Sequence, residues 1–124
     1  MAKMFSYRDR ALQSKDAIDL LSSKWRIPIL HLLREGALRT GELHGALPEI
    51  SAKMLTQTLR GMERDGLIVR SVHSVIPPRV EYSLTEMGTS LLEPLRDLCV
   101  WAHAHVQQRD MARARFDVDR PRRR

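Results

Sequence analysis

The spacing of apolar residues in the first part of the chain predicts two helices. Residues 14–23 and residues 24–36 each place apolar side chains three or four positions apart, as one face of a helix requires. Ser14 is the expected N-cap of the first helix. Pro28 lies early in the second helix, so we expect it to bend or shorten the first turn. Trp25, just before it, is expected in the core.

Two more helices follow, joined by a short turn. The first of them is predicted over residues 40–47, and Pro48 prevents its continuation. The second is predicted over residues 51–64, and its first residue, a serine, is a strong N-cap candidate. Ile50 and Leu55 stand where a hydrophobic contact commonly fixes the start of a helix. This is the most strongly marked element in the chain.

The two faces of residues 51–64 differ in character. At about 100° per residue, one face is apolar and is expected to point into the core. The opposite face is basic and rich in hydrogen-bonding groups, and it carries no carboxylate. The apolar face consists of Leu55, Leu59 and Met62, and the outward face, here named the recognition stripe, consists of Lys53, Gln57, Arg60 and Arg64.

After Gly66, a residue suited to the position just past a helix end, the pattern changes from helical to alternating. Residues 67–74 and 79–84 are rich in β-branched side chains and predict the two strands of a hairpin. The pair Pro77–Pro78 stands before the second strand, although proline pairs poorly in a sheet. We interpret the pair as stiffening an extended tip, which holds Arg79 in place.

A long last helix, capped by Thr85, is predicted after the hairpin. Pro94 is expected to kink it. Its apolar stripe is longer than a small core needs, so we expect it to pack against a second copy of the chain, with Trp101 as an anchor. The alternative is that the stripe covers its own domain. The stripe consists of Leu91, Leu95, Leu98, Ala102 and Val106.

Four helices, a hairpin and a final helix predict a winged helix-turn-helix. The expected fold class is mainly α with a small β-hairpin, with N- and C-terminal dimerisation helices. We expect an N-terminal arm at residues 1–13, the winged helix-turn-helix domain with its C-terminal dimerisation helix at 14–108, and a basic, flexible tail at 109–124. In this fold, residues 51–64 form a helix that can enter a DNA major groove.

Charge supports a polyanionic partner without locating its binding face. The 124-residue chain has a formal net charge of +6, which favours nucleic acid as a partner. Much of the excess lies in residues 109–124, which hold seven arginines and three aspartates. The single cysteine excludes an internal disulfide and fits a reducing cytoplasm. No apolar run is long enough for a membrane span, and no secretory signal is expected.

Other chemistry is weakly supported. Cys99 and His103 lie four positions apart on the last predicted helix, but two ligands do not make a metal site. The sequence has no glycine-rich phosphate loop and no nucleophile elbow, so no catalytic residue, metal or cofactor is predicted. An enzyme would be recognised by turnover without affinity for DNA. A winged-helix protein-interaction module without sequence-specific DNA binding is a further alternative, against which the basic recognition stripe argues.

Three stretches resemble one family. "SKW", "ISAKMLTQTLRGMERDGLIVR" and "PPRVEYSLTEMG" are similar, in order and spacing, to the HxlR-type winged helix-turn-helix transcriptional regulators. The resemblance covers roughly residues 17–101. It implies a homodimeric, DNA-binding regulator without cofactor or enzymatic activity, with Ser51–Arg64 as the recognition helix and Arg79 in the wing. Many relatives sense oxidants through a cysteine before the tryptophan, but here no cysteine precedes Trp25.

The expected site residues form two groups. Within the first, Lys53 and Gln57 are expected to read bases, and Arg60 and Arg64 to contact phosphates. A small-molecule effector would be compatible with this function, but the sequence does not identify one. The expected DNA-binding residues are Thr40, Ser51, Lys53, Met54, Gln57, Arg60, Arg64 and Arg79, and the expected dimer residues are Ile18, Leu21, Leu91, Leu95, Leu98, Trp101 and Ala102.

Overall fold

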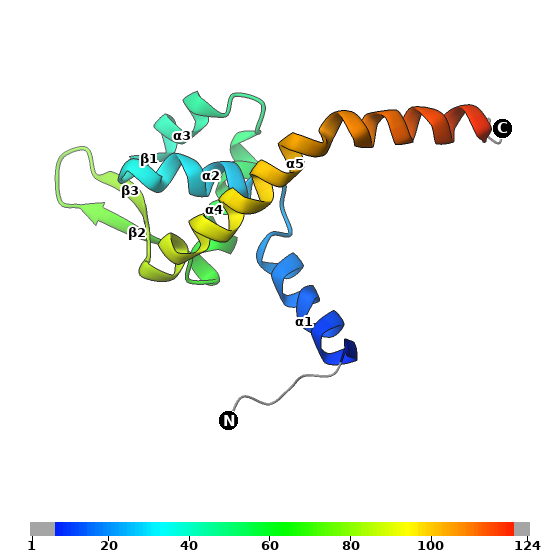
Figure 1. The fold of residues 1–124 in the computed structure, drawn as a ribbon. Coiled ribbons are helices and arrows are strands. Elements are labelled where there is room, and N and C mark those ends of the chain that lie inside the picture. Colours follow the sequence, from blue (N-terminus) through cyan, green and yellow to red (C-terminus); the bar gives the residue numbers. More distant parts are fainter. Residues whose placement is uncertain (1–6, 121–124) are drawn as a thin grey trace. The chain divides into compact units, whose positions relative to one another are not determined.

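Residues 7–120, which this computed structural model describes, form five α-helices, one short 3-10 helix and three β-strands (Figure 1). The chain divides into two units, residues 1–92 and residues 93–124, and the last helix contributes to both. The elements are α1 (Tyr7–Leu20), α2 (Arg26–Leu32), the 3-10 helix η1 (Leu33–Glu35), β1 (Leu38–Arg39), α3 (Thr40–Ala46), α4 (Ala52–Arg64), β2 (Ile68–His73), β3 (Arg79–Leu84) and α5 (Glu86–Asp119).

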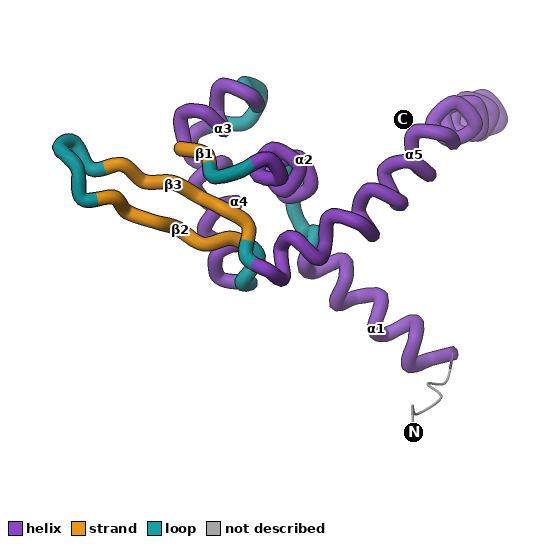
Figure 2. Tube along the Cα trace, turned by 60° about the vertical axis from the view of Figure 1, so that its left-hand side comes forward, coloured by secondary structure: helices purple, strands orange, loops and turns teal. Residues whose placement is uncertain are grey.

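The three strands form one antiparallel sheet in the order β1-β3-β2. Figure 2 shows β2 and β3 as a hairpin that extends beyond the short β1. The predicted hairpin is confirmed, and its register pairs His73 with Arg79. The sequence did not predict β1, in which Leu38 pairs with Tyr82 of β3. A strand of two residues is too short to show an alternating pattern.

The core of the first unit lies where α2, α3 and α4 meet the base of the hairpin. Residues from all four elements are fully buried because their apolar positions recur at the period of their own helix or strand. The winged helix-turn-helix architecture predicted from the element order is therefore confirmed. The fully buried side chains are Ile29, Leu30, Leu43, Ile50, Leu55, Leu59, Met62, Leu67 and Ile68.

The junction between α4, β2 and α5 is held by the side chain of Thr85. Its hydroxyl lies 2.5 Å from the carbonyl oxygen of Gly66 and 3.1 Å from that of Leu67, and it accepts a hydrogen bond from the Gly88 amide at 3.0 Å. Thr85 thus caps α5, as predicted. Gly66 adopts a φ of 78°, the left-handed conformation that glycine tolerates best. Gly88 is required because a Cβ there would collide with the Leu67 carbonyl.

The first helix is longer than predicted. α1 begins at Tyr7 instead of at Ser14, and none of its side chains is buried. The Ser14 hydroxyl donates to the Ala11 carbonyl at 2.6 Å, inside the helix, and so does not cap a helix start. Residues 7–13 of the predicted arm are therefore helical. The rest of the arm, residues 1–6, lies outside the described residues.

The second helix also starts differently. α2 begins at Arg26, so Pro28 lies in the first turn, where its missing N–H removes no intrahelical hydrogen bond. The helix thus starts two residues later than the predicted segment, and the bend expected at Pro28 stays a prediction. Trp25 is half-buried and not in the core, and the ammonium of Lys24 lies 5.1 Å from the centre of its ring. A tryptophan can keep one face open in this way while the other packs.

The segment predicted as a flexible tail is largely helical. α5 runs without interruption from Glu86 to Asp119, through Pro94 and through most of the expected tail. Arginine and alanine are abundant there, and both favour helices, a preference that the net charge hid. Residues 121–124 lie outside the described residues. The division into two units falls just before Pro94, and the kink expected there stays a prediction.

Candidate nucleic-acid interface

The recognition stripe occupies an open face of α4. All four of its side chains are exposed, whereas Leu55, Leu59 and Met62 on the opposite face are at most 1% exposed. The separation follows from the period of 3.6 residues per turn, because apolar positions recur on one side only. The stripe therefore presents three cations and one amide to anything that approaches α4.

The start of α4 is fixed by three contacts. The Ser51 hydroxyl accepts a hydrogen bond from the Met54 amide at 3.1 Å, which confirms the predicted N-cap. Ile50 and Leu55, the two predicted packing partners around this start, are both buried. His44 in the last turn of α3 donates from Nε2 to the Ile50 carbonyl at 2.9 Å. The sequence analysis did not find His44, since a single histidine near a turn is a weak signal.

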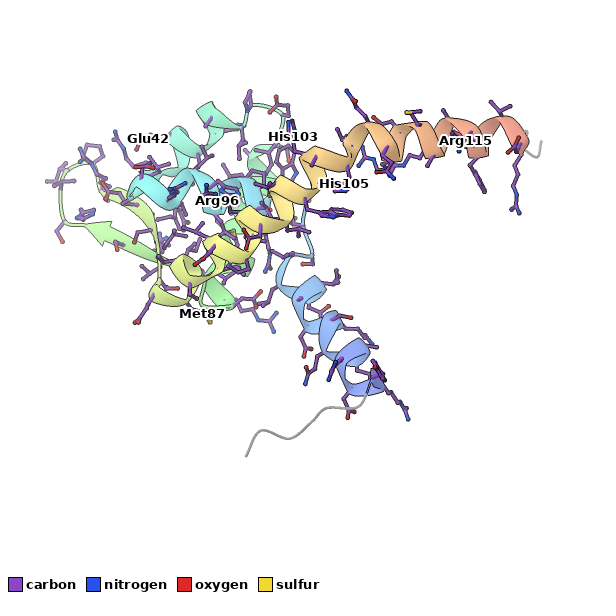
Figure 3. The ribbon with its side chains drawn as sticks, viewed as in Figure 1. Glu42, Met87, Arg96, His103, His105 and Arg115 are labelled. Atoms are coloured by element: carbon purple, nitrogen blue, oxygen red, sulfur yellow. The ribbon has the colours of Figure 1, made fainter. Side chains whose placement is uncertain are left out.

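Arg39 and Glu42 fix the start of α3. Oε1 of Glu42 accepts hydrogen bonds from the Arg39 amide at 3.0 Å and from its Nε at 3.3 Å. Figure 3 labels Glu42. These two bonds, the backbone bond first, hold the pKa of Glu42 below its ordinary value, and the charges of Arg39 and Arg79 add to the effect. Thr40 is exposed at the same helix start. Arg39, beside it, is an exposed cation that the sequence analysis missed.

The hairpin carries an exposed apolar tip followed by an exposed arginine. Val75 is half-exposed, Ile76 is fully exposed, and the Ile76–Pro77 peptide bond is cis. Pro78 follows, and Arg79 then begins β3. Because its backbone is paired with His73 in the sheet, Arg79 is anchored at the base of the tip by strand pairing. The stiffening role expected of the two prolines stays a prediction.

An open groove of about 580 Å³ runs between the hairpin tip and β1. Arg39, His73 and Arg79 contribute basic side chains to its lining, and Glu81 contributes a carboxylate. Nε2 of His73 lies 3.3 Å from Oε2 of Glu81, so this carboxylate already has a partner. The groove therefore suits an anionic group, such as a phosphate, better than a cation.

The cations of the recognition stripe and Arg79 of the hairpin are available to a ligand. In the part of the chain that the structure describes, none of Lys53, Arg60, Arg64 and Arg79 forms an ion pair with a carboxylate. An exposed cation without such a partner can release its counterions when it binds a polyanion. The recognition stripe and Arg79 also belong to the same unit of the chain. The structure thus provides two basic surfaces, one on α4 and one on the hairpin.

The residues expected at a dimer interface are mostly accessible. Ile18 on α1 is 68% exposed, and Leu98 and Trp101 on α5 are 50% and 61% exposed. Ala102 is exposed as well, and Leu21 and Leu91 are half-buried. Leu95 differs, because it is only 3% exposed within the single chain and has no apolar surface left for a partner. We therefore remove Leu95 from the expected interface.

Trp101 stacks on His105 one turn further along α5. The two ring centroids are 4.5 Å apart with an angle of 20° between the ring planes, and Nδ1 of His105 donates to the Trp101 carbonyl at 2.7 Å. The stack holds the indole in one orientation although most of it is exposed. Figure 3 labels His105 and, further along the same helix, Arg115 on the segment that we expected to be flexible. A pre-ordered exposed tryptophan is well suited to anchor an interface.

Other kinds of site find no support in the geometry. Within residues 7–120, no three histidine, cysteine or acidic side chains lie close enough together to hold a metal ion. Cys99 is half-buried on α5. In the same range, no helix combines the length and the apolar character needed to cross a bilayer.

Comparison with known proteins identifies the relatives of the chain. The sequence model of the HxlR-like helix-turn-helix family matches residues 20–110. The HTH-type transcriptional regulator YkvN of Bacillus subtilis (strain 168), itself uncharacterized, is 39% identical over 103 residues, which cover 83% of this chain and 86% of YkvN. These relatives are transcriptional regulators and not enzymes.

Solved structures agree with the sequence match. The reduced form of the transcriptional regulator YodB from B. subtilis is 32% identical and superposes with a TM-score of 0.67, covering 80% of this chain and 92% of YodB. A transcriptional regulator of the MarR family from Enterococcus faecalis V583 is 34% identical, with a TM-score of 0.73, and covers 89% of this chain and 97% of that protein. The fold is therefore that of winged-helix transcriptional regulators, a class that acts through DNA.

Proposed function

Because the chain belongs to the HxlR-like helix-turn-helix family, we propose that it is a sequence-specific DNA-binding regulator that acts as a homodimer on a palindromic operator. One observation carries the proposal. The recognition stripe places Lys53, Gln57, Arg60 and Arg64 on the open face of a capped helix, without a carboxylate among them. A helix with such a face fits the width and the chemistry of the DNA major groove.

Position along α4 divides the stripe into two roles. The N-terminal residues of a recognition helix generally meet base edges, so Lys53 and Gln57 are assigned to bases, with Ser51 and Met54 at the leading edge. Glutamine suits adenine and lysine suits guanine, since these pairs match donors with acceptors. Arg60 and Arg64 lie further along the helix and are assigned to phosphates. These contacts would supply most of the affinity but little of the sequence preference.

The hairpin supplies a second contact. Arg79 is assigned to the minor groove or to the phosphates beside it, because it is exposed at the base of the tip and forms no ion pair within the described residues. A narrow minor groove at A·T base pairs attracts arginine through its negative potential. Thr40 at the start of α3 is assigned to the backbone, together with the neighbouring Arg39.

A homodimer would let two recognition helices act on one site. α1 offers Ile18 to a partner, and the exposed part of the α5 stripe offers Leu98 and Trp101. Exposed apolar surface of this kind often marks an interface. A two-fold dimer would set its recognition helices about 34 Å apart, which is one turn of DNA. The operator would then be palindromic. Such a regulator works in the cytoplasm and needs no cofactor, and its effector is not assigned.

Selection of bound sequences from a random pool of duplex DNA tests this function. The wild type is expected to enrich a palindrome, whereas the variant Lys53→Ala/Gln57→Ala, whose changes lie on the exposed face and leave the core intact, should lose that enrichment. Thermal unfolding of both proteins checks that the variant is folded. A folded wild type that enriches no sequence would contradict the proposal and would favour the protein-interaction module.

A further inference from the structure

A buried arginine links three helices at the end of α4 that lies away from its N-cap. Arg26, the first residue of α2, is 8% exposed, and its Nη1 lies 2.6 Å from Oδ2 of Asp65 at the C-cap of α4. The same Nη1 lies 2.8 Å from the carbonyl oxygen of Leu20, the last residue of α1. One guanidinium therefore joins the end of α1, the start of α2 and the end of α4.

The surrounding groups fit this arrangement electrostatically. The last carbonyls of a helix lack partners within the helix and carry partial negative charge, so a cation at the ends of α1 and α4 is favourable. An aspartate at the C-terminus of a helix would by itself be unfavourable for the same reason. Asp65 is acceptable there because Arg26 neutralises it. Asp65 lies away from the recognition stripe, so its charge does not oppose DNA.

Glycine at position 61 leaves room for the arginine. A Cβ at Gly61 would come within 2.7 Å of Nη2 of Arg26, a distance that would force the guanidinium to move. Glycine inside a helix is less favourable than alanine, because it loses more backbone freedom on folding. The guanidinium of Arg26 therefore explains why glycine stands at position 61, near the C-terminal end of α4, although alanine would favour the helix more.

From this geometry we propose that Arg26 is a positioning residue for DNA recognition, which fixes the direction of α4 relative to α1. The proposal rests on the proposed function, since it concerns how the recognition stripe is presented. α4 is held at its N-terminal end by Ser51, Ile50 and His44, and the bonds of Arg26 hold the other end. At about 1.5 Å per residue, its 13 residues are long enough for a small tilt at one end to displace the stripe.

The hydrogen bond from Arg26 to the Leu20 carbonyl at the end of α1 links the recognition helix to the proposed dimer interface. If α1 contributes to the dimer interface, then Arg26 sets the orientation of each recognition helix relative to that interface. The two helices must meet two half-sites at a fixed spacing, so a tilt at either one weakens specific contacts first. Contacts with phosphates on random DNA tolerate the same tilt, because they need no register.

Two variants release the contact in different ways. Arg26→Met/Asp65→Leu removes both charges together, which avoids leaving one of them buried alone. Gly61→Ala keeps both charges but fills the space that Nη2 occupies, and it raises the helix propensity of α4. Arg34→Met/Glu35→Leu is the matched control, because it removes an exposed ion pair from η1 and, like both releasing variants, leaves the net charge unchanged.

Affinity for the selected operator and for random duplex is measured for each folded variant. Both releasing variants are expected to lose at least about tenfold in operator affinity, as for the loss of a good base contact. Their affinity for random duplex should stay close to that of the wild type and of Arg34→Met/Glu35→Leu. A loss confined to the operator, with random-duplex affinity and cooperative unfolding retained, is a combination that a merely structural role would not produce.

Combining the changes gives the decisive outcome. In the Arg26→Met/Asp65→Leu background, Gly61→Ala should have no further effect on operator affinity, because the guanidinium that it displaces is gone. Additive losses, or unchanged operator affinity in both releasing variants, would overturn the positioning role while leaving the DNA-binding function in place. A wild type without any operator preference would overturn both.

Discussion

Oε1 of Glu42 lies 3.0 Å from the backbone nitrogen of Arg39, and this hydrogen bond closes the first turn of α3. The bond and the charges of Arg39 and Arg79 lower the pKa of Glu42. α3 also holds the turn that precedes the recognition helix, because His44 in its last turn donates a hydrogen bond to the Ile50 carbonyl. A carboxylate at the start of α3 thus supports the position of α4 from a distance.

The lowered pKa of Glu42 predicts a pH-dependent contribution to stability. A carboxyl group whose pKa is lower in the folded state stabilises the fold above its unfolded pKa and ceases to do so as the pH falls through the folded value. Glu42→Gln should therefore be less stable than the wild type at neutral pH, and the difference should shrink as the pH falls below the ordinary value of 4.5. Denaturant unfolding of both proteins at several pH values, from about pH 3 to about pH 7, measures the difference in the free energy of unfolding.

Glu35→Gln is the control for that series. Glu35 is 89% exposed, and its ion pair with Arg34 spans 4.0 Å, so its loss should change little at any pH. A Glu42→Gln difference that stayed constant down to the lowest pH would show that the carboxylate is not the stabilising group.

Gln57 is predicted to determine base preference. Gln57→Ala should cost about 1–3 kcal/mol on the selected operator and relax the preference at one base pair, because a bidentate contact is lost. Arg64→Ala should instead weaken binding to all sequences and reduce the slope of affinity against salt by about one. Titrations of operator and random duplex at several salt concentrations separate the two effects. Equal binding of Gln57→Ala and the wild type to both duplexes would remove Gln57 from base reading.

Arg79 is predicted to read the flanks of the operator. Arg79→Ala should lower affinity and abolish any preference for A·T flanks, because the guanidinium no longer reaches the minor groove. Its melting temperature should match that of the wild type, since the side chain is exposed. Arg34→Ala, which removes an exposed arginine from η1, controls for charge. A large loss of thermal stability in Arg79→Ala would identify a structural role instead.

Thiol reagents are predicted to leave DNA binding unchanged. The chain has one cysteine, Cys99, and none before Trp25. Operator affinity is measured for the wild type and for Cys99→Ser before and after treatment with an electrophile. Both proteins should bind equally in all four conditions. Release of the operator by the treated wild type alone would show that Cys99 is a sensor.

Leu98→Glu is predicted to dissociate the homodimer. The substitution places a charge in the apolar stripe of α5, and burying an unpaired carboxylate in an interface is strongly unfavourable. Sedimentation at micromolar concentration should show a folded monomer with weakened operator binding. Val100→Glu is the matched control, because Val100 is also exposed but lies about 200° away around the helix. A wild type that sediments as a monomer yet binds its operator tightly would contradict the dimer.

The architecture of the first unit could be predicted because its signals are local. The apolar spacing of Leu55, Leu59 and Met62, the serine cap and Gly66 each follow from the geometry of a single helix. The alternation in β2 and β3 likewise depends on neighbouring residues. The same locality explains why the recognition stripe was found, since the face opposite a buried stripe must be exposed.

What the sequence did not reveal depends on contacts between distant segments. β1 is visible only through its pairing with β3, and Arg26 meets Asp65 across 39 positions of the chain. The helical character of residues 109–119 was missed for a different reason: a high net charge was read as disorder, although arginine and alanine form helices well. Leu95 was misassigned because periodicity shows that a residue is apolar but not what covers it.

The central claim is that two recognition helices read one operator through its major groove. Methylation interference tests it directly, because methylation of guanine N7 blocks that groove alone. On the selected operator, the wild type should show two symmetric patches of interference about one turn, or 34 Å, apart, and the patches should weaken in Lys53→Ala. A single patch, or binding that methylation does not affect anywhere in the site, would contradict the account.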